Sequence, residues 1–221
     1  MAFLQSPPAR EPFLHAPGSV LGLIAVLVAI HLAVLYVPIP DQALEPFVFV
    51  SARFIHDAPS PALVLPLFSH MFLHGSYLHL IVNCLWLLAF GPAVARRLGG
   101  ILFLVFFLLC GAAGALMELA LTWGSDVAMI GASGGISGLM AAGFRMLRWP
   151  GAPSGNRLVP ILSRPILMFT GLWLVTNLIF GLTGFGTGNS GDQIAWQAHM
   201  GGYLFGLFAI GGFERLRRFA L

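Results

Sequence analysis

The chain has 221 residues, of which 58% are hydrophobic and only 9% are charged. This composition excludes a soluble globular domain, so we expect the chain to reside in a lipid bilayer. The formal net charge of +3 comes from arginines in predicted loops rather than from a basic stripe with interleaved aromatic residues, which excludes nucleic acid as a partner.

Six long apolar stretches predict an all-α membrane protein with a six-transmembrane-helix bundle. Each stretch is near the roughly 20 residues that cross a hydrocarbon core, and none alternates with the period of two of a barrel strand. In chain order they run at about 19-37, 77-95, 100-122, 130-148, 164-184 and 193-213.

No repeat or linker marks a second domain, so residues 19-214 are expected to form one six-span domain. The preceding segment, 1-18, has no apolar core of a signal peptide, so the first span should remain as an anchor, and 215-221 should be a tail. The loop at about 38-76 is rich in Pro and aromatic residues and is expected to lie in the membrane interface.

The arginines predict the orientation of the spans, because positive charge is retained on the cytoplasmic side. All eleven basic residues are arginines, and the loops on one side carry Arg10, Arg96, Arg97, Arg145, Arg148, Arg157, Arg164, Arg215, Arg217 and Arg218. The opposite loops carry five acidic residues and Arg53. Both termini are therefore expected to be cytoplasmic.

Ser133 and His199 are the candidate nucleophile and general base. Each lies seven residues after an outer-side charge, Asp126 and Asp192 respectively, which predicts equal depth, at most roughly 10 Å below the boundary. An ionisable residue within a span is costly and marks function, and a neutral imidazole can activate a serine hydroxyl. Since no carboxylate is predicted beside them, we expect a dyad.

His79 and Asn83 lie one helical turn apart in the second span and are the candidate oxyanion-hole donors. The backbone N–H of Ser133, at the start of a helix, is a third candidate. For Asn83 alone, an interhelical hydrogen bond is the alternative role. His31 in the first span is expected to be a hydrogen-bonded structural residue.

Small residues at four-residue spacing predict close contact between the fourth and sixth spans, although Gly is also simply frequent in membrane helices. The pairs are Gly134 with Gly138, Ala198 with Gly202, and Gly202 with Gly206.

Metal and cofactor chemistry is not expected. His70, His74 and His79 lack the glutamate of a zinc-binding H-E-x-x-H motif, and Cys84 and Cys110 fall within apolar spans, which favours inert thiols.

Three linked motifs resemble the rhomboid family: Ser69 to Asn83 (SHMFLHGSYLHLIVN), Gly131-Ala132-Ser133-Gly134, and Ala198-His199-Met200-Gly201-Gly202. The resemblance implies a six-helix intramembrane serine protease. Its dyad would be Ser133 and His199, with His79, Asn83 and the Ser133 amide as oxyanion donors. By the same resemblance His74, His70, Gly131 and Gly134 would be supporting residues.

The resemblance also implies substrates and location. Substrates would be single-span or other membrane proteins with small residues at the cleavage site and a destabilised helix, cut toward the extracytoplasmic side of a bacterial inner membrane. Two positions depart from the family pattern. Ala52-Arg53 stands where many relatives carry Trp-Arg, and Ser137 where some carry a Tyr that stacks on the imidazole.

Two other functions compete with proteolysis. One is a non-catalytic rhomboid-like protein that binds transmembrane helices, although that class typically lacks the Ser or the His. The other is a small transporter, which the lack of an obvious repeat between the first and last three spans disfavours.

Overall fold

Uninterrupted apolar runs become helices in a bilayer because lipid leaves no other partner for the backbone N–H and C=O groups. The computed structural model describes residues 16–58, 60–147, 158–183 and 195–219. Within these ranges the six longest helices coincide with the six apolar stretches: α1 (Gly18–Tyr36), α5 (Tyr77–Leu98), α6 (Gly100–Leu121), α7 (Ser133–Met146), α8 (Arg164–Thr183) and α9 (Trp196–Phe219).

Four of these helices, α1, α5, α6 and α8, are long and apolar enough to cross a membrane. The prediction of spanning helices is confirmed for these four. The helix α7 has only 14 residues, and α9 carries Gln197 and His199 in its first turn and arginines in its last.

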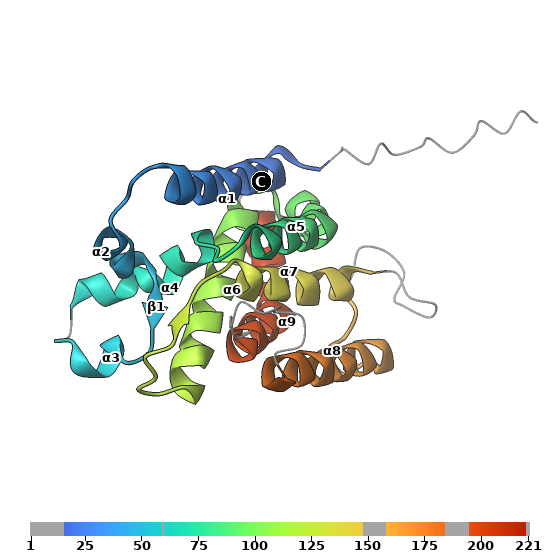
Figure 1. Ribbon diagram of the computed structural model, residues 1–221. Coiled ribbons are helices and arrows are strands. Elements are labelled where there is room, and N and C mark those ends of the chain that lie inside the picture. Colours follow the sequence, from blue (N-terminus) through green and yellow to red (C-terminus); the bar gives the residue numbers. More distant parts are fainter. Residues whose placement is uncertain (1–15, 59, 148–157, 184–194, 220–221) are drawn as a thin grey trace, which may run out of the picture.

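The helix α7 lies in the middle of the bundle, against α5, α6 and α9, while α1 and α8 lie on opposite sides (Figure 1). Fully or almost fully buried apolar side chains fill the space between α1, α5, α6, α7 and α9, among them Leu27, Leu87, Phe106, Leu139 and Ile210. Large apolar side chains such as Leu85, Leu172 and Phe208 are exposed on the outer helix faces, as expected for a lipid-facing surface.

Glycines bring α7 and α9 together, as the small-residue pairs predicted. A Cβ added to Gly138 would lie 2.8 Å from the Gly202 carbonyl oxygen, and one added to Gly206 would overlap the Gly138 carbonyl oxygen. The two backbones can approach this closely only because neither helix has side chains there.

The long loop consists of short elements: α2 (Asp41–Leu44), the 3-10 helix η1 (Glu45–Phe47), β1 (Phe49–Val50), α3 (Arg53–His56), η2 (Pro61–Val64), α4 (Pro66–Ser69) and η3 (His70–Phe72). The strand β1 pairs antiparallel with β2 (Ala128–Met129), with Phe49 opposite Met129. This pairing was not predicted, because two residues are too few for an alternating pattern. It ties the loop to the segment that leads into Ser133.

Arginine contacts join one end of α5, α7 and α9. Arg97 Nε lies 2.5 Å from Glu214 Oε1, Arg217 Nη1 donates to the Arg96 carbonyl oxygen at 3.1 Å, and Arg145 Nη1 donates to that of Leu207 at 2.7 Å. His79, Ser133 and His199 lie near the opposite ends of the same helices.

Several helix boundaries differ from the prediction; α5, for example, ends at Leu98 rather than at 95. The helix α7 begins at Ser133 rather than at 130, because Gly131 has a φ of 120° and cannot be helical. The helix α9 continues beyond 213 to Phe219, so residues 215–219 of the predicted tail are helical. Most of the predicted segment 1-18 lies outside the described residues.

Candidate active site

Ser133 is the first residue of α7. The first amides of a helix have no intrahelical acceptor, so the N–H of Ser133 is available to a ligand. The Ser133 side chain is partly exposed, and its Oγ lies 2.7 Å from Nε2 of His199. The predicted approach of these two residues is therefore present as a direct hydrogen bond.

The other ring nitrogen of His199 is also hydrogen-bonded. Its Nδ1 lies 2.8 Å from Oδ1 of Asn177, a buried residue of α8, and Asn177 Nδ2 donates to the Trp196 carbonyl oxygen at 2.9 Å. Asn177 was not predicted from the sequence, and the group that holds the imidazole was left open there. The signal was available, because Asn177 is an amide inside an apolar span, as is Asn83.

Glu118 lies close to the start of α9 but does not take the place of a third, orienting carboxylate. It accepts a hydrogen bond from the backbone N–H of Ala198. The imidazole of His199 instead has an amide oxygen at Nδ1. The described hydrogen bonds of His199 thus join a serine, a histidine and an asparagine.

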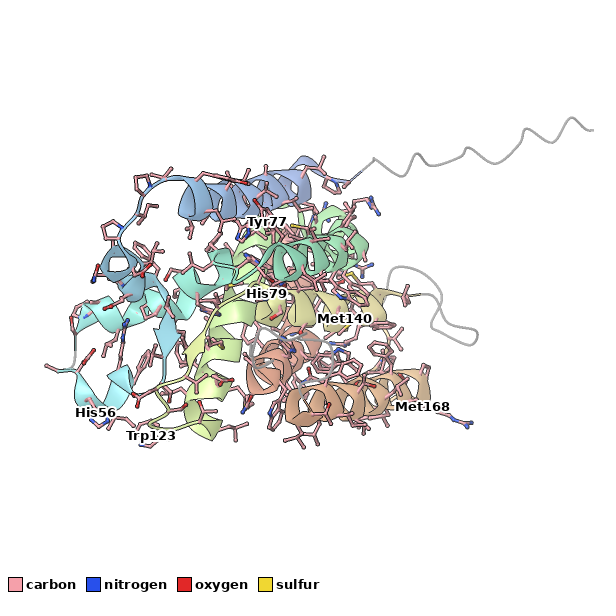
Figure 2. All side chains as sticks on the ribbon, viewed as in Figure 1. His56, Tyr77, His79, Trp123, Met140 and Met168 are labelled. Atoms are coloured by element: carbon pink, nitrogen blue, oxygen red, sulfur yellow. The ribbon has the colours of Figure 1, made fainter. Side chains whose placement is uncertain are left out.

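His79 lies where α5 approaches the segment before α7, as Figure 2 shows. Its ring packs against Gly131: a Cβ added to Gly131 would lie 2.6 Å from His79 Nε2. Gly131 is needed at this position for two reasons, its positive φ and the space that the imidazole occupies. The segment Gly131 to Ser133 and the His79 ring therefore form one wall of the site.

Asn83 is buried on α5, one turn after His79, and its Nδ2 donates to the His79 carbonyl oxygen at 2.9 Å. A side-chain amide has two N–H donors, so this bond to its own helix uses one and fixes the direction of the second. This hydrogen bond lies within α5, and it fixes the orientation of the Asn83 side-chain amide.

His70 supports the segment before the serine. Its carbonyl oxygen accepts from the Gly131 N–H at 2.9 Å, and its Nδ1 hydrogen-bonds the Pro66 carbonyl oxygen at 2.7 Å. Burial lowers the pKa of His70 to about 4, so the ring is neutral near pH 7.

His74 packs edge-on against His79, with ring centroids 5.1 Å apart. Its pKa is also lowered to about 4, chiefly by burial and further by the neighbouring His79 and His31. His31 on α1 is buried and packs against the Tyr77 ring at 5.0 Å. The hydrogen bond expected for His31 is not formed with any of the described residues.

Gly134, the residue after Ser133, lies at the contact between α7 and α9. A Cβ on Gly134 would lie 3.4 Å from the Ala198 carbonyl oxygen, and one on Gly202 would overlap the Gly134 carbonyl oxygen. The residues next to Ser133 and His199 are therefore in backbone contact, which holds the two side chains at hydrogen-bond distance.

The structure places the two positions that depart from the family pattern, Ser137 and Ala52-Arg53. Ser137 is buried on α7, and the aromatic residue near His199 on its own helix, Tyr203, stacks on Trp173 at 4.3 Å rather than on the imidazole. Arg53 Nη1 donates to the Glu45 carbonyl oxygen at 2.5 Å, and Ala52 N–H donates to that of Ser125, which seats this part of the loop.

Comparison with known proteins agrees with the motifs. The Rhomboid domain family model matches residues 62–214. The rhomboid protease GlpG of Serratia proteamaculans is 32% identical over 142 residues, which cover 63% of this chain and 44% of that protein. Those of Yersinia pestis and Yersinia pseudotuberculosis are 30% identical over 141 residues, with the same coverage of 63% and 44%.

This chain thus spans less than half the length of these relatives. The family match includes every candidate residue of the site, from His70 to His199. The chain belongs to the rhomboid family.

Proposed function

We propose that this chain is an intramembrane serine endopeptidase in which Ser133 is the nucleophile and His199 the general base. The observation that carries the proposal is the 2.7 Å contact between Ser133 Oγ and His199 Nε2 within a membrane-embedded bundle. Its relatives are named rhomboid proteases, which supports the same reaction.

The first step joins Ser133 Oγ to the carbonyl carbon of the substrate peptide bond while His199 Nε2 takes the hydroxyl proton. The resulting imidazolium then gives this proton to the leaving amine as the C–N bond breaks, which leaves an ester on Ser133. In the second step His199 takes a proton from water and the hydroxide attacks the ester carbon. The bond from that carbon to Ser133 Oγ then breaks, the carboxylic acid product leaves, and His199 returns the proton to Ser133 Oγ. The partial exposure of Ser133 supports such access for water.

The oxyanion that forms in each step needs donors placed in advance, because preorganised donors stabilise charge as it develops. We assign this role to His79, Asn83 and the Ser133 N–H. The packing of His79 on Gly131 and the first-turn position of Ser133 support the assignment. His70 and His74 support this wall from behind.

We further propose six spans, with α7 and α9 as the two additional ones. With Arg145 at the inner boundary, the rise from Arg145 to Ser133 is about 18 Å, which leaves about 12 Å of a hydrocarbon core of about 30 Å above Ser133. The arginine-bearing helix ends would face the cytoplasm, with both termini there and the site toward the extracytoplasmic side of a bacterial inner membrane.

The proposed substrates are membrane-anchored proteins with small residues at the cleaved bond and a weakened helix beyond it. A peptide bond in a regular helix is shielded by its own hydrogen bonds, so the segment must unwind before a serine can attack it. Residues 19-214 would form the protease domain, with the loop 38-76 in the membrane interface.

Cleavage of a model transmembrane substrate in detergent or liposomes tests the proposal. We expect Ser133→Ala and His199→Ala each to lower the rate by about 10³-fold or more, since each removes a member of the dyad. Ser137→Ala is the matched control, because it removes a buried hydroxyl one turn further along the same helix. Cleavage that survives Ser133→Ala would refute the proposal, and substrate binding with no cleavage by the unaltered chain would favour the non-catalytic alternative.

A further inference from the structure

Asn177 makes two hydrogen bonds whose chemistry fixes the protonation of His199. Its Nδ2 lies 2.9 Å from the carbonyl oxygen of Trp196, which can only accept, so the amide must present its N–H to that oxygen. The amide oxygen Oδ1 must therefore face the imidazole, where it lies 2.8 Å from Nδ1.

An amide oxygen can only accept a hydrogen bond, so Nδ1 of His199 must carry the proton. A neutral imidazole has one N–H, and Nε2 is then left with a lone pair. This lone pair lies 2.7 Å from Ser133 Oγ, the position that a general base requires. The Trp196 carbonyl oxygen thus determines the orientation of the Asn177 amide, and the amide determines which nitrogen of His199 carries the proton.

We infer that Asn177 is the positioning residue that holds His199 in the Nδ1–H tautomer and aims Nε2 at Ser133. It does so from α8, a different helix from those that carry the serine and the histidine. This inference rests on the proposed function for its catalytic consequence, although the tautomer itself does not depend on that function.

The competing interpretation is that Asn177 merely joins α8 to α9 through its bond to Trp196. Two variants separate these roles, because both lose the N–H donor to the Trp196 carbonyl oxygen. Asn177→Asp keeps an acceptor for Nδ1, whereas Asn177→Leu has none. A purely structural role predicts the same defect in both.

Thr170→Val provides a control for helix packing. The Thr170 hydroxyl hydrogen-bonds the Tyr203 hydroxyl at 2.8 Å and is thus another polar contact between α8 and α9, made without His199. Loss of this contact should leave both the tautomer and the reactivity of Ser133 unchanged.

The experiment uses the full chain in detergent micelles with two readouts. The first is the rate at which a fluorophosphonate probe labels Ser133, and the second is the tautomer of His199 from long-range proton–nitrogen correlations of ¹⁵N-histidine-labelled protein. For Asn177→Leu we expect labelling to slow by about 10- to 100-fold, part of the roughly 10²- to 10⁴-fold that a general base contributes, and the Nε2–H tautomer to become populated.

Asn177→Asp should keep the Nδ1–H tautomer and label roughly 10-fold faster than Asn177→Leu. Equal rates in the Asp and Leu variants, an unchanged tautomer in the Leu variant, or an equal loss in Thr170→Val would overturn the inference. If the unaltered chain does not label at Ser133, the proposed function fails, while the tautomer measurement still decides the role of Asn177.

Discussion

Replacement of Gly131 by alanine should disable the site without unfolding the bundle. The added Cβ would lie 2.6 Å from His79 Nε2, against at least 3.4 Å for an ordinary contact, so the imidazole must retreat by about 0.8 Å. Displacement of a positioned group by about 1 Å can cost about 10²-fold in rate. The positive φ of 120° adds backbone strain of about 1–3 kcal/mol.

We therefore expect Gly131→Ala to lower kcat about 100-fold in a liposome cleavage assay and to lower the thermal unfolding midpoint. Gly99→Ala is the matched control, because Gly99 also has a positive φ, 83°, yet its added Cβ would meet no atom within 4 Å. The control should lose stability and keep its activity. Full activity in Gly131→Ala, or an equal loss of activity in Gly99→Ala, would refute the assigned position of His79.

Two further predictions concern stability. Gly202→Ala should lower the free energy of unfolding by roughly 1–3 kcal/mol, because its Cβ overlaps the Gly134 carbonyl oxygen, whereas Gly212→Ala on the same helix meets no atom within 4 Å and should be neutral or stabilising in thermal unfolding. Burial lowers the pKa of His70 and His74 from 6.5 to about 4, so the unfolded chain binds protons first as the pH falls. The thermal unfolding midpoint should thus be highest above about pH 6.5, as far as these two histidines are concerned, and should fall as the pH is lowered from about 6.5 to about 4. In His74→Gln this dependence of the midpoint on pH should be weaker. An unchanged pH dependence in that variant would contradict the lowered pKa of His74.

The positions of the helices were accessible from the sequence because long apolar runs favour helices in a bilayer. The pairing of Ser133 with His199 was accessible for a related reason: each follows an acidic residue, Asp126 or Asp192, by seven positions, which predicted a common depth. The 2.7 Å contact between their side chains agrees with that depth argument.

Asn177 was missed because no acidic residue lies close to it in the sequence. The next charged residue along the chain is Asp192, fifteen positions later, whereas Ser133 and His199 each follow an acidic residue by seven positions. Hydropathy also does not specify how α8 is rotated, and this rotation decides whether Asn177 faces lipid or His199. The pairing of Phe49 with Met129 was missed because it depends on a meeting of two loops, which no local pattern encodes.

If Ser133 and His199 act as proposed, the contact between α7 and α9 also determines when the chain becomes reactive during its synthesis. Ser133 enters the membrane 66 residues before His199, and the glycine surfaces that align them exist only when both helices are present. A nascent chain that has inserted α7 but not α9 therefore carries a serine with no base. On the proposed function, proteolytic activity begins only with the docking of the last helix, so an incompletely synthesised chain cannot cleave its neighbours in the membrane.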